Sequence, residues 1–211
     1  RNGSNVIVNS HATEPLPFGA VVPAVNEVNI KDPAAVAGAL RRALDQFGRR
    51  PRRAALVVPD AVAKVSIVKF EEVPTRSHDL DELVRWQVRK TAPFRIEDAQ
   101  VVYSRGLTDD TGATDFVVAL TRRSIIEEYE QVCAEVGVHA GVVDLSSFNI
   151  VNTVISGDRV DGDWLLVHVA PESSTITIMR GDQLILFRNR PAEAGAQLAD
   201  LVYQTSMYYE D

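Results

Sequence analysis

The chain has 211 residues, of which 45% are hydrophobic and 24% are charged, and its formal net charge is −7. This length allows one large domain or two small ones, and the composition is that of a folded globular protein. The excess of Asp and Glu argues against broad binding of nucleic acid through phosphate neutralisation. No apolar run approaches the roughly 18 residues of a membrane span. Cys133 is the only cysteine, so an internal disulfide is excluded and a cytosolic setting is expected.

The first part of the chain has four runs with strand patterning and one helix. The helix begins at Asp32, because an Asp followed by Pro33 is typical of an N-cap and first turn, and it ends before Gly48. The strand-like runs are Asn5–Ser10, Val21–Ile30, Ala54–Val58 and Ala63–Phe70. The last two flank a Pro-Asp turn, which predicts a β-hairpin.

The middle of the chain alternates helices and strands. A helix is predicted over Asp79–Thr91, and Pro93 prevents it from continuing. The elements predicted after it are strands over Gln100–Arg105 and Asp115–Leu120, a helix over Ser124–Val136, a strand over His139–Asp144 and a helix over Ser146–Ile155.

The last part predicts a three-stranded meander and a final helix. The strands are Trp164–Ala170, Thr175–Arg180 and Gln183–Arg188, and the helix is Pro191–Tyr209. The mixture of β-hairpins and interspersed helices indicates an α/β or α+β protein.

The familiar enzyme motifs are absent from the sequence. There is no Gly-rich phosphate cradle that ends in Lys-Ser/Thr, no GxGxxG, no HExxH and no nucleophile elbow. The four histidines lack metal-ligand spacing, and Cys133 is expected to be a small buried hydrophobe of its helix. The sequence therefore predicts no metal site and no catalytic residue.

Two features have both a binding and a structural interpretation. The first is a cluster of six arginines: Arg41, Arg42, Arg49, Arg50, Arg52 and Arg53. This cluster is either a binding patch, for anionic lipid or for an acidic partner, or a solvated helix end whose charges suit the helix dipole.

The second feature is Trp86, which lies off the Leu80–Val84–Val88 stripe of its helix, together with Pro93 and Phe94. These three either line a groove for a peptide or close a small core, and both can hold.

Three stretches together resemble one known family. They are EPLPFGAVVPAVNEVNIKDPAAVAGALRRAL (Glu14–Leu44), ELVRWQVRKTAPFRIEDAQVVY (Glu82–Tyr103) and TRRSIIEEYEQVCAEVGVHAGVVDLSSFNIVN (Thr121–Asn152). Their content, order and spacing are similar to those of the PilM-like proteins of type IV pilus assembly. That family is related to the cell-division protein FtsA and has the actin-like ATPase fold.

The resemblance implies a ribonuclease-H-like core, interrupted by a small α+β subdomain and followed by the start of a second lobe. The implied divisions are residues 1–72 and 106–160 for the core lobe, 73–105 for the inserted subdomain and 161–211 for the second lobe. The chain resembles a fragment, since the family's first phosphate hairpin is expected before Arg1 and its Gly-Gly nucleotide segment after Asp211.

The resemblance also identifies a degenerate phosphate loop in the run LLVHVAPESSTITI. His168 occupies the family's acidic position and Ala170 its glycine position, while Ser173, Ser174 and Thr175 keep the small hydroxyls. A neutral imidazole is a poor Mg²⁺ ligand, and the Cβ of Ala170 lies where the backbone must approach a phosphate. ATP with Mg²⁺ is thus implied only for a full-length protein, and hydrolysis is not expected.

By resemblance, the chain is a cytoplasmic scaffold at the inner face of the inner membrane. It is expected to bind the N-terminal peptide of an inner-membrane partner in a groove between core and subdomain, to assemble as a ring and to meet the membrane only through that partner. The residues expected at the groove are Leu83, Arg85, Trp86, Arg89, Pro93 and Phe94.

The alternative function is that of an active actin-like ATPase whose nucleotide state switches partner binding. A small-molecule kinase ranks last, because no acidic residue is placed as its base.

Overall fold

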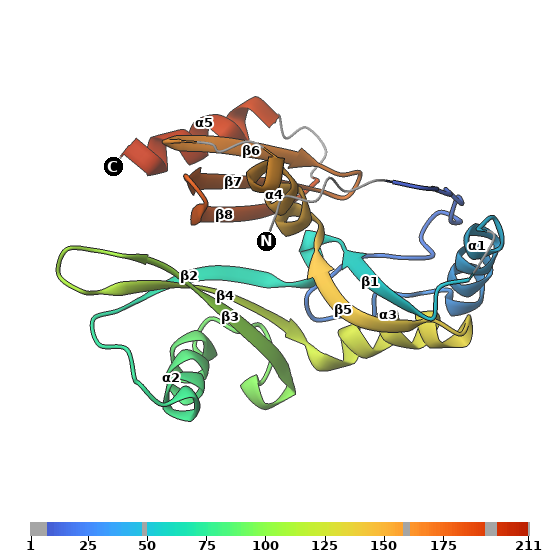
Figure 1. Cartoon of the computed structure of the whole chain (residues 1–211), viewed down its shortest axis with the longest axis horizontal. Coiled ribbons are helices and arrows are strands. Elements are labelled where there is room, and N and C mark those ends of the chain that lie inside the picture. Colours follow the sequence, from blue (N-terminus) through green and yellow to red (C-terminus); the bar gives the residue numbers. More distant parts are fainter. Residues whose placement is uncertain (1–7, 48–49, 158–160, 193–197, 211) are drawn as a thin grey trace.

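The structure is a computed structural model that describes residues 8–47, 50–157, 161–192 and 198–210. The helices are α1 (Pro33–Asp45), α2 (Ser77–Arg89), α3 (Arg123–Glu135), α4 (Ser146–Gly157) and α5 (Leu198–Glu210). The strands are β1 (Arg53–Val58), β2 (Lys64–Phe70), β3 (Ala99–Thr108), β4 (Thr114–Arg122), β5 (His139–Leu145), β6 (Asp163–Val169), β7 (Ser173–Arg180) and β8 (Gln183–Pro191). Two 3₁₀ turns are η1 (Asp60–Val62) and η2 (Ile96–Asp98). The mixed α/β class predicted from the sequence is confirmed, and the strands form three sheets (Figure 1).

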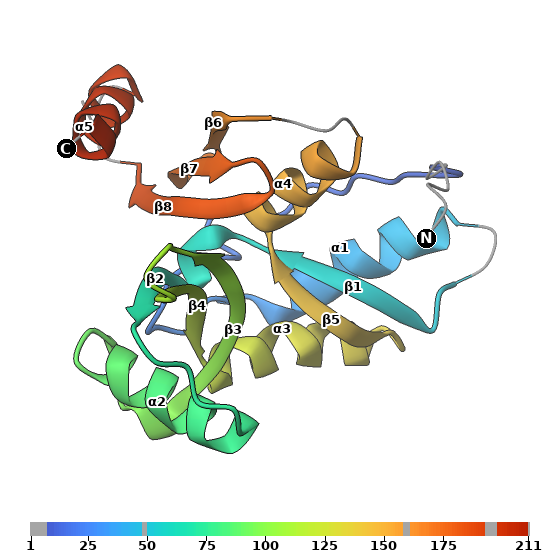
Figure 2. The same cartoon turned by 60° about the vertical axis from the view of Figure 1, so that its left-hand side comes forward.

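The first sheet is a parallel pair made of β1 and β5. Helices α1 and α3 pack against each other beside this pair, and their shared core includes Leu44, Val132 and Val136. Asp32 caps α1 as predicted, because its carboxylate accepts a hydrogen bond from the backbone N–H of Ala35 at 2.9 Å. Figure 2 shows α1 and α3 along the same side of the pair.

The second sheet has the order β2-β4-β3 and is antiparallel. Helix α2 covers one face of it. Val84 and Val88 on α2 are buried against Phe116, Val118 and Leu120 on β4. Because side chains alternate across a strand, the opposite face of this sheet carries a separate set that includes Val102 and Ala119.

The third sheet is the predicted meander, β6-β7-β8. Gly181, with a φ of 57°, makes the tight turn between β7 and β8. The central strand β7 is buried almost throughout, and β8 lies against β2 and β3 of the second sheet.

The predicted hairpin of Ala54–Val58 and Ala63–Phe70 is wrong. Turn η1 sends the chain from one sheet to another, so β1 pairs with β5 and β2 pairs with β4. A buried apolar run has the same pattern in either arrangement, and the sequence did not distinguish them.

The predicted strand at Val21–Ile30 is also not found, and the one at Asn5–Ser10 lies partly outside the described residues. Val21–Ile30 contains a single antiparallel bridge, between its two ends. The Asn29 side chain folds the segment between them, because it donates to the carbonyl oxygens of Ala24 and Glu27 and accepts from the Ala24 N–H. Within Asn5–Ser10, residues 5–7 lie outside the described residues and 8–10 form no strand.

The predicted final helix begins later than expected. Strand β8 runs to Pro191, residues 193–197 lie outside the described residues, and α5 begins at Leu198.

The expected inserted subdomain at 73–105 shares its sheet with residues on both sides of it. Strand β2 precedes this segment and β4 follows it, so the unit built by the second sheet and α2 extends over residues 64–122. The division into two lobes stays a prediction. Among the described residues, no helix has both the length and the apolar character needed to cross a membrane.

The core of the second sheet gives the first testable prediction. Leu120 is 0% exposed, so Leu120→Ala is expected to lower the free energy of unfolding by about 2–5 kcal/mol. Urea denaturation followed by circular dichroism measures this loss. Val28→Ala, at an exposed position, is the matched control and should change the free energy by less than about 0.5 kcal/mol. Equal losses in the two variants would contradict the assigned core.

Candidate functional site

A buried carboxylate lies where the two parallel strands end. Asp60 follows β1 and is 3% exposed, and Ser147 lies in the first turn of α4, directly after β5. Parallel strands present their carboxyl ends at the same edge of a sheet, which is the usual position of ligand sites in open α/β proteins. Asp60 and Ser147 therefore meet at this edge.

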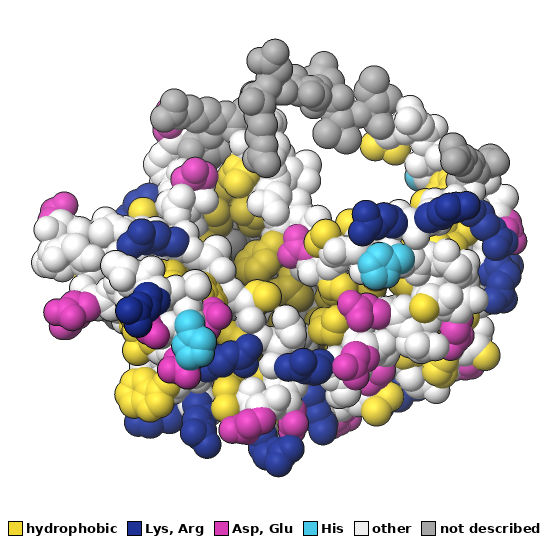
Figure 3. Space-filling view, turned by 60° about the horizontal axis from the view of Figure 1, so that its bottom comes forward, with side chains coloured by type: hydrophobic (Ala, Val, Ile, Leu, Met, Phe, Trp, Pro, Cys, Tyr) yellow, Lys and Arg dark blue, Asp and Glu magenta, His cyan; other side chains and the backbone are white. Residues whose placement is uncertain are grey.

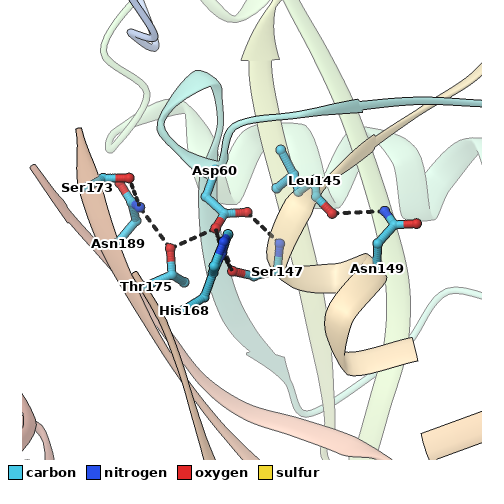
Figure 4. Close-up of polar contacts among 8 residues, drawn as sticks. All are labelled: Asp60, Leu145, Ser147, Asn149, His168, Ser173, Thr175 and Asn189. Carbon is cyan, nitrogen blue, oxygen red and sulfur yellow. Dashed lines mark hydrogen bonds and ion pairs between the residues drawn. The ribbon is translucent and has the colours of Figure 1, made fainter. Parts of the chain in front are cut away.

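Asp60 is held by donors from two other elements (Figure 4). Its Oδ1 accepts from the backbone N–H of Ser147 at 2.9 Å. Its Oδ2 accepts from Ser147 Oγ at 2.5 Å and from Thr175 Oγ1, on β7, at 2.7 Å. The Nδ1 atom of His168, on β6, lies 3.3 Å from the same oxygen. The carboxylate thus faces the N-terminus of α4, where the helix dipole favours a negative charge.

The polar network continues into β8. The Nδ2 atom of Asn189 donates to Thr175 Oγ1 at 2.9 Å and to Ser173 Oγ at 3.3 Å. Both hydroxyl side chains are buried. The network consequently joins the parallel pair to all three strands of the meander.

Ser147, His168 and Asp60 do not form a hydrolase triad. In such a triad the two ring nitrogens of the histidine face different partners, one the serine and one the acid. Here Nδ1 faces both, because it also lies 3.0 Å from Ser147 Oγ. Ser147 is moreover 0% exposed, so a substrate cannot reach it.

The expected phosphate loop lies at this network, and its residues do not fit a Mg²⁺–nucleotide. Ser173 and Thr175 lie together on one side of β7, but both hydroxyls are engaged with Asn189 and Thr175 also with Asp60. Ser174 alternates to the other side of the strand. The adjoining cavity, of about 290 Å³, includes His168, Ala170 and the carboxylates of Asp60 and Glu172, but no Lys or Arg among its described lining residues. A phosphate chain needs positive charge or free donors.

A separate groove lies between the second sheet and the parallel pair. It has a volume of about 450 Å³ and is largely apolar. Its walls include Val102 on β3, Ala119 on β4, Ile126 on α3 and Phe148 on α4, with Val58 of β1 and Val62 of η1 beside them. Val143 and Leu145 of β5 complete the apolar lining, while Arg123, Glu127 and Glu130 add charge.

The groove extends toward the third sheet. A second hollow of about 310 Å³ shares Asp144 and Phe148 with the groove and reaches Met179 and Leu184. Figure 3 looks at the face that carries α2 and α3 and shows a hollow floored by hydrophobic side chains near its centre.

Two strand edges border this groove. The order β2-β4-β3 leaves β3 at an edge of its sheet, and within the described residues β5 pairs with β1 alone. Val102 on β3 is 56% exposed and Val142 on β5 is 59% exposed. Open edges beside an apolar groove are the geometry into which an extended peptide adds as a strand.

The six predicted partner-binding residues lie elsewhere. They belong to α2 and the loop after it, which cover the opposite face of the second sheet, and the described lining of the groove includes none of them. Leu83 and Phe94 pack against the core of that sheet, Arg85 is half-buried, and Trp86, Arg89 and Pro93 are exposed.

The remaining sequence predictions concern Cys133 and the arginines. Cys133 is buried in α3 as predicted, and this burial raises the pKa of its thiol. Arg42 pairs with Glu14 at 2.8 Å and Arg50 pairs with Asp45, while Arg49 lies outside the described residues. These pairs favour the structural interpretation of the arginine cluster.

Within the described part of the chain, no group of three His, Cys, Asp or Glu is arranged to hold a metal.

Comparison with solved structures defines the class of fold. A chain of a PilM–PilN type IV pilus biogenesis complex aligns with a TM-score of 0.72 at 20% identity, over 83% of this chain and 52% of that one. The present chain thus spans about half the length of that protein. A Bacteroides thetaiotaomicron protein described as having an actin-like ATPase fold and unknown function aligns with a TM-score of 0.44, at 11% identity over 82% of this chain and 61% of its own.

The cytoplasmic domain of EpsL, an inner-membrane component of the type II secretion system of Vibrio cholerae, aligns with a TM-score of 0.48. Its identity is 12%, over 74% of this chain and 56% of its own. Both of these scores are too low to say more about this chain. The fold is therefore that of the chain in the PilM–PilN complex.

The family follows from the sequence match. Residues 1–210 match the family described as type IV pilus assembly protein PilM, which is nearly the whole chain. The chain belongs to the PilM family, and its fold is of the mixed α/β class expected from the sequence.

The Asp60 network gives a second testable prediction. Asp60→Ala leaves the Ser147 and Thr175 donors without an acceptor, so the free energy of unfolding is expected to fall by about 3 kcal/mol. Asp98→Ala removes an exposed carboxylate paired with Arg95 and should cost less than about 1 kcal/mol. Urea denaturation measures the free energy of unfolding of both variants. An Asp60→Ala loss no larger than that of Asp98→Ala would refute the structural role of the network.

Proposed function

We propose that this chain is an adaptor of the type IV pilus machinery that captures the N-terminal cytoplasmic peptide of an inner-membrane assembly protein. Membership of the PilM family supports the pilus role, and the similar chain comes from a complex with PilN. The adaptor acts in the cytoplasm at the inner face of the inner membrane, where copies of it form a ring.

The apolar groove between the second sheet and the parallel pair carries this proposal. Its volume suits several apolar side chains of an extended peptide, and the edges of β3 and β5 offer backbone groups for strand addition. The carboxylates of Glu127 and Glu130 line the groove and suit a positively charged amino terminus. The proposal therefore places the peptide in the groove rather than on α2.

The peptide gives the third testable prediction. Val102→Glu puts a carboxylate at the exposed edge of the groove and should weaken peptide binding at least about tenfold. The probe is a synthetic peptide with the N-terminal residues of the PilN-type protein from the same organism, and the measurement is isothermal titration calorimetry.

Trp86→Ala is the control that separates the groove from the α2 surface. Because Trp86 lies on the opposite side of the second sheet, this variant should bind the peptide with unchanged affinity. The reverse result, with Trp86→Ala weakened and Val102→Glu unchanged, would place the peptide at the residues predicted from the sequence. Thermal denaturation of both variants confirms that they are folded.

We also propose that the adaptor works without ATP hydrolysis. The buried hydroxyls of Ser173 and Thr175 are engaged within the protein, and carboxylates line the adjoining cavity. The runner-up, an ATPase whose nucleotide state switches partner binding, needs a site that takes Mg–ATP.

The fourth testable prediction concerns the binding of Mg–ATP, which thermal denaturation measures. A ligand at 100 times its Kd would add about 2.7 kcal/mol to the free energy of unfolding. We expect millimolar Mg–ATP to leave the Tm of this chain unchanged. A clear rise in Tm that Asp60→Asn abolishes would favour the ATPase instead.

A further inference from the structure

The outer face of α2 exposes a large aromatic side chain among cations. Trp86 is 62% exposed, although it belongs to a helix whose other large apolar residues pack against the second sheet. The Nζ atom of Lys90 lies 5.9 Å from the centre of its ring, and the next exposed cation along this face is Arg89. A cation at this distance from a Trp ring is in cation–π contact.

This end of α2 is positive in an acidic protein. Residues 85–98 contain four cations and two carboxylates, whereas the whole chain has a net charge of −7. Arg95 donates two hydrogen bonds to Asp98, and the pKa of Asp98 is lowered by Arg95 first and also by Arg122 and Arg123. The start of α3 therefore contributes to the same positive field.

We propose that Trp86, Arg89, Lys90 and Arg95, here called the Trp86 surface, contact the anionic headgroups of a phospholipid bilayer. Lys and Arg near such a bilayer are attracted to its negative surface potential, and the indole ring of Trp partitions into the interface between headgroups and acyl chains. The contact is independent of the peptide groove. It also replaces the expectation that this chain meets the membrane only through its partner.

The shape and charge of the surface favour a bilayer over an acidic protein. Trp86 projects from the outer face of α2 with Lys90 against its ring, and an indole beside a cation suits the interface between headgroups and acyl chains. Asp79, Asp81 and Glu82 lie in the first half of α2, whereas Arg85, Arg89 and Lys90 lie in its last turns or directly after them. Arg89 is 3.9 Å from the Glu97 carboxylate. The C-terminal end of α2 is therefore the part that suits a negative surface.

Vesicle sedimentation tests the proposal with the whole chain. Wild-type protein should sediment with vesicles that contain phosphatidylglycerol, lose this binding at high salt and fail to bind vesicles of phosphatidylcholine alone. The double variant Arg89→Glu/Lys90→Glu should reduce the bound fraction about tenfold or more, and Trp86→Ala should reduce it less.

A matched variant controls for net charge. Lys31→Glu/Arg190→Glu makes the same change in charge at two exposed positions outside the Trp86 surface and should bind vesicles as the wild type does. An equal loss in this variant would overturn the proposal, because binding would then follow overall charge.

Fluorescence provides a second readout that reports on Trp86 itself. Trp164→Phe leaves Trp86 as the single tryptophan, and its emission should shift to shorter wavelength when phosphatidylglycerol vesicles are added. Absence of that shift, or equal binding to neutral vesicles, would refute the lipid contact.

Failure of the lipid proposal and failure of the peptide proposal give different results. Val102→Glu should lose the peptide and keep the vesicles, while Arg89→Glu/Lys90→Glu should do the opposite. Wild-type protein that binds the peptide but no vesicles would overturn the lipid proposal alone.

Discussion

The buried carboxylate of Asp60 is the constraint on which the arrangement of the sheets depends. A charge that is removed from water is costly unless hydrogen-bond donors surround it, and these donors come from elements distant in the sequence. Ser147 supplies a backbone N–H and a hydroxyl, and Thr175 supplies a second hydroxyl. The meander can move away from the parallel pair only if this carboxylate loses a partner. The edge at which an open α/β protein usually binds its ligand is thus occupied by contacts within the protein.

The same turn of α4 connects this network to the apolar groove. Ser147 donates to Asp60, and the next residue, Phe148, lines the groove and packs against Phe187 of β8 with their ring centres 5.3 Å apart. A shift of α4 would therefore disturb both the polar network and the groove. The residues expected to form a phosphate loop have a structural task, since His168, Ser173 and Thr175 belong to the network that fixes a wall of the groove.

Most of the features that the sequence predicted correctly depend on residues close together in the chain. The N-cap at Asp32 and the off-stripe position of Trp86 depend on near neighbours in the chain, and the structure has both. Pairing between distant segments was not accessible in this way. The paired strands β1 and β5 are separated in the sequence by all the strands of the second sheet. The apolar run of β1 is equally typical of one strand of a hairpin. Asp60 was missed for the same reason, because its donors come from α4 and β7.

The proposed groove and the proposed lipid-facing helix together have a physical advantage that neither has alone. Peptide capture by an open groove is weak when the peptide is flexible, because ordering it costs entropy. A few cations and one Trp also bind a bilayer only marginally, since stable attachment usually takes two signals. When the peptide belongs to a membrane protein, the first contact raises the effective concentration for the second. In the proposed arrangement two modest contacts hold the adaptor at the membrane, and each stays reversible when the other is lost.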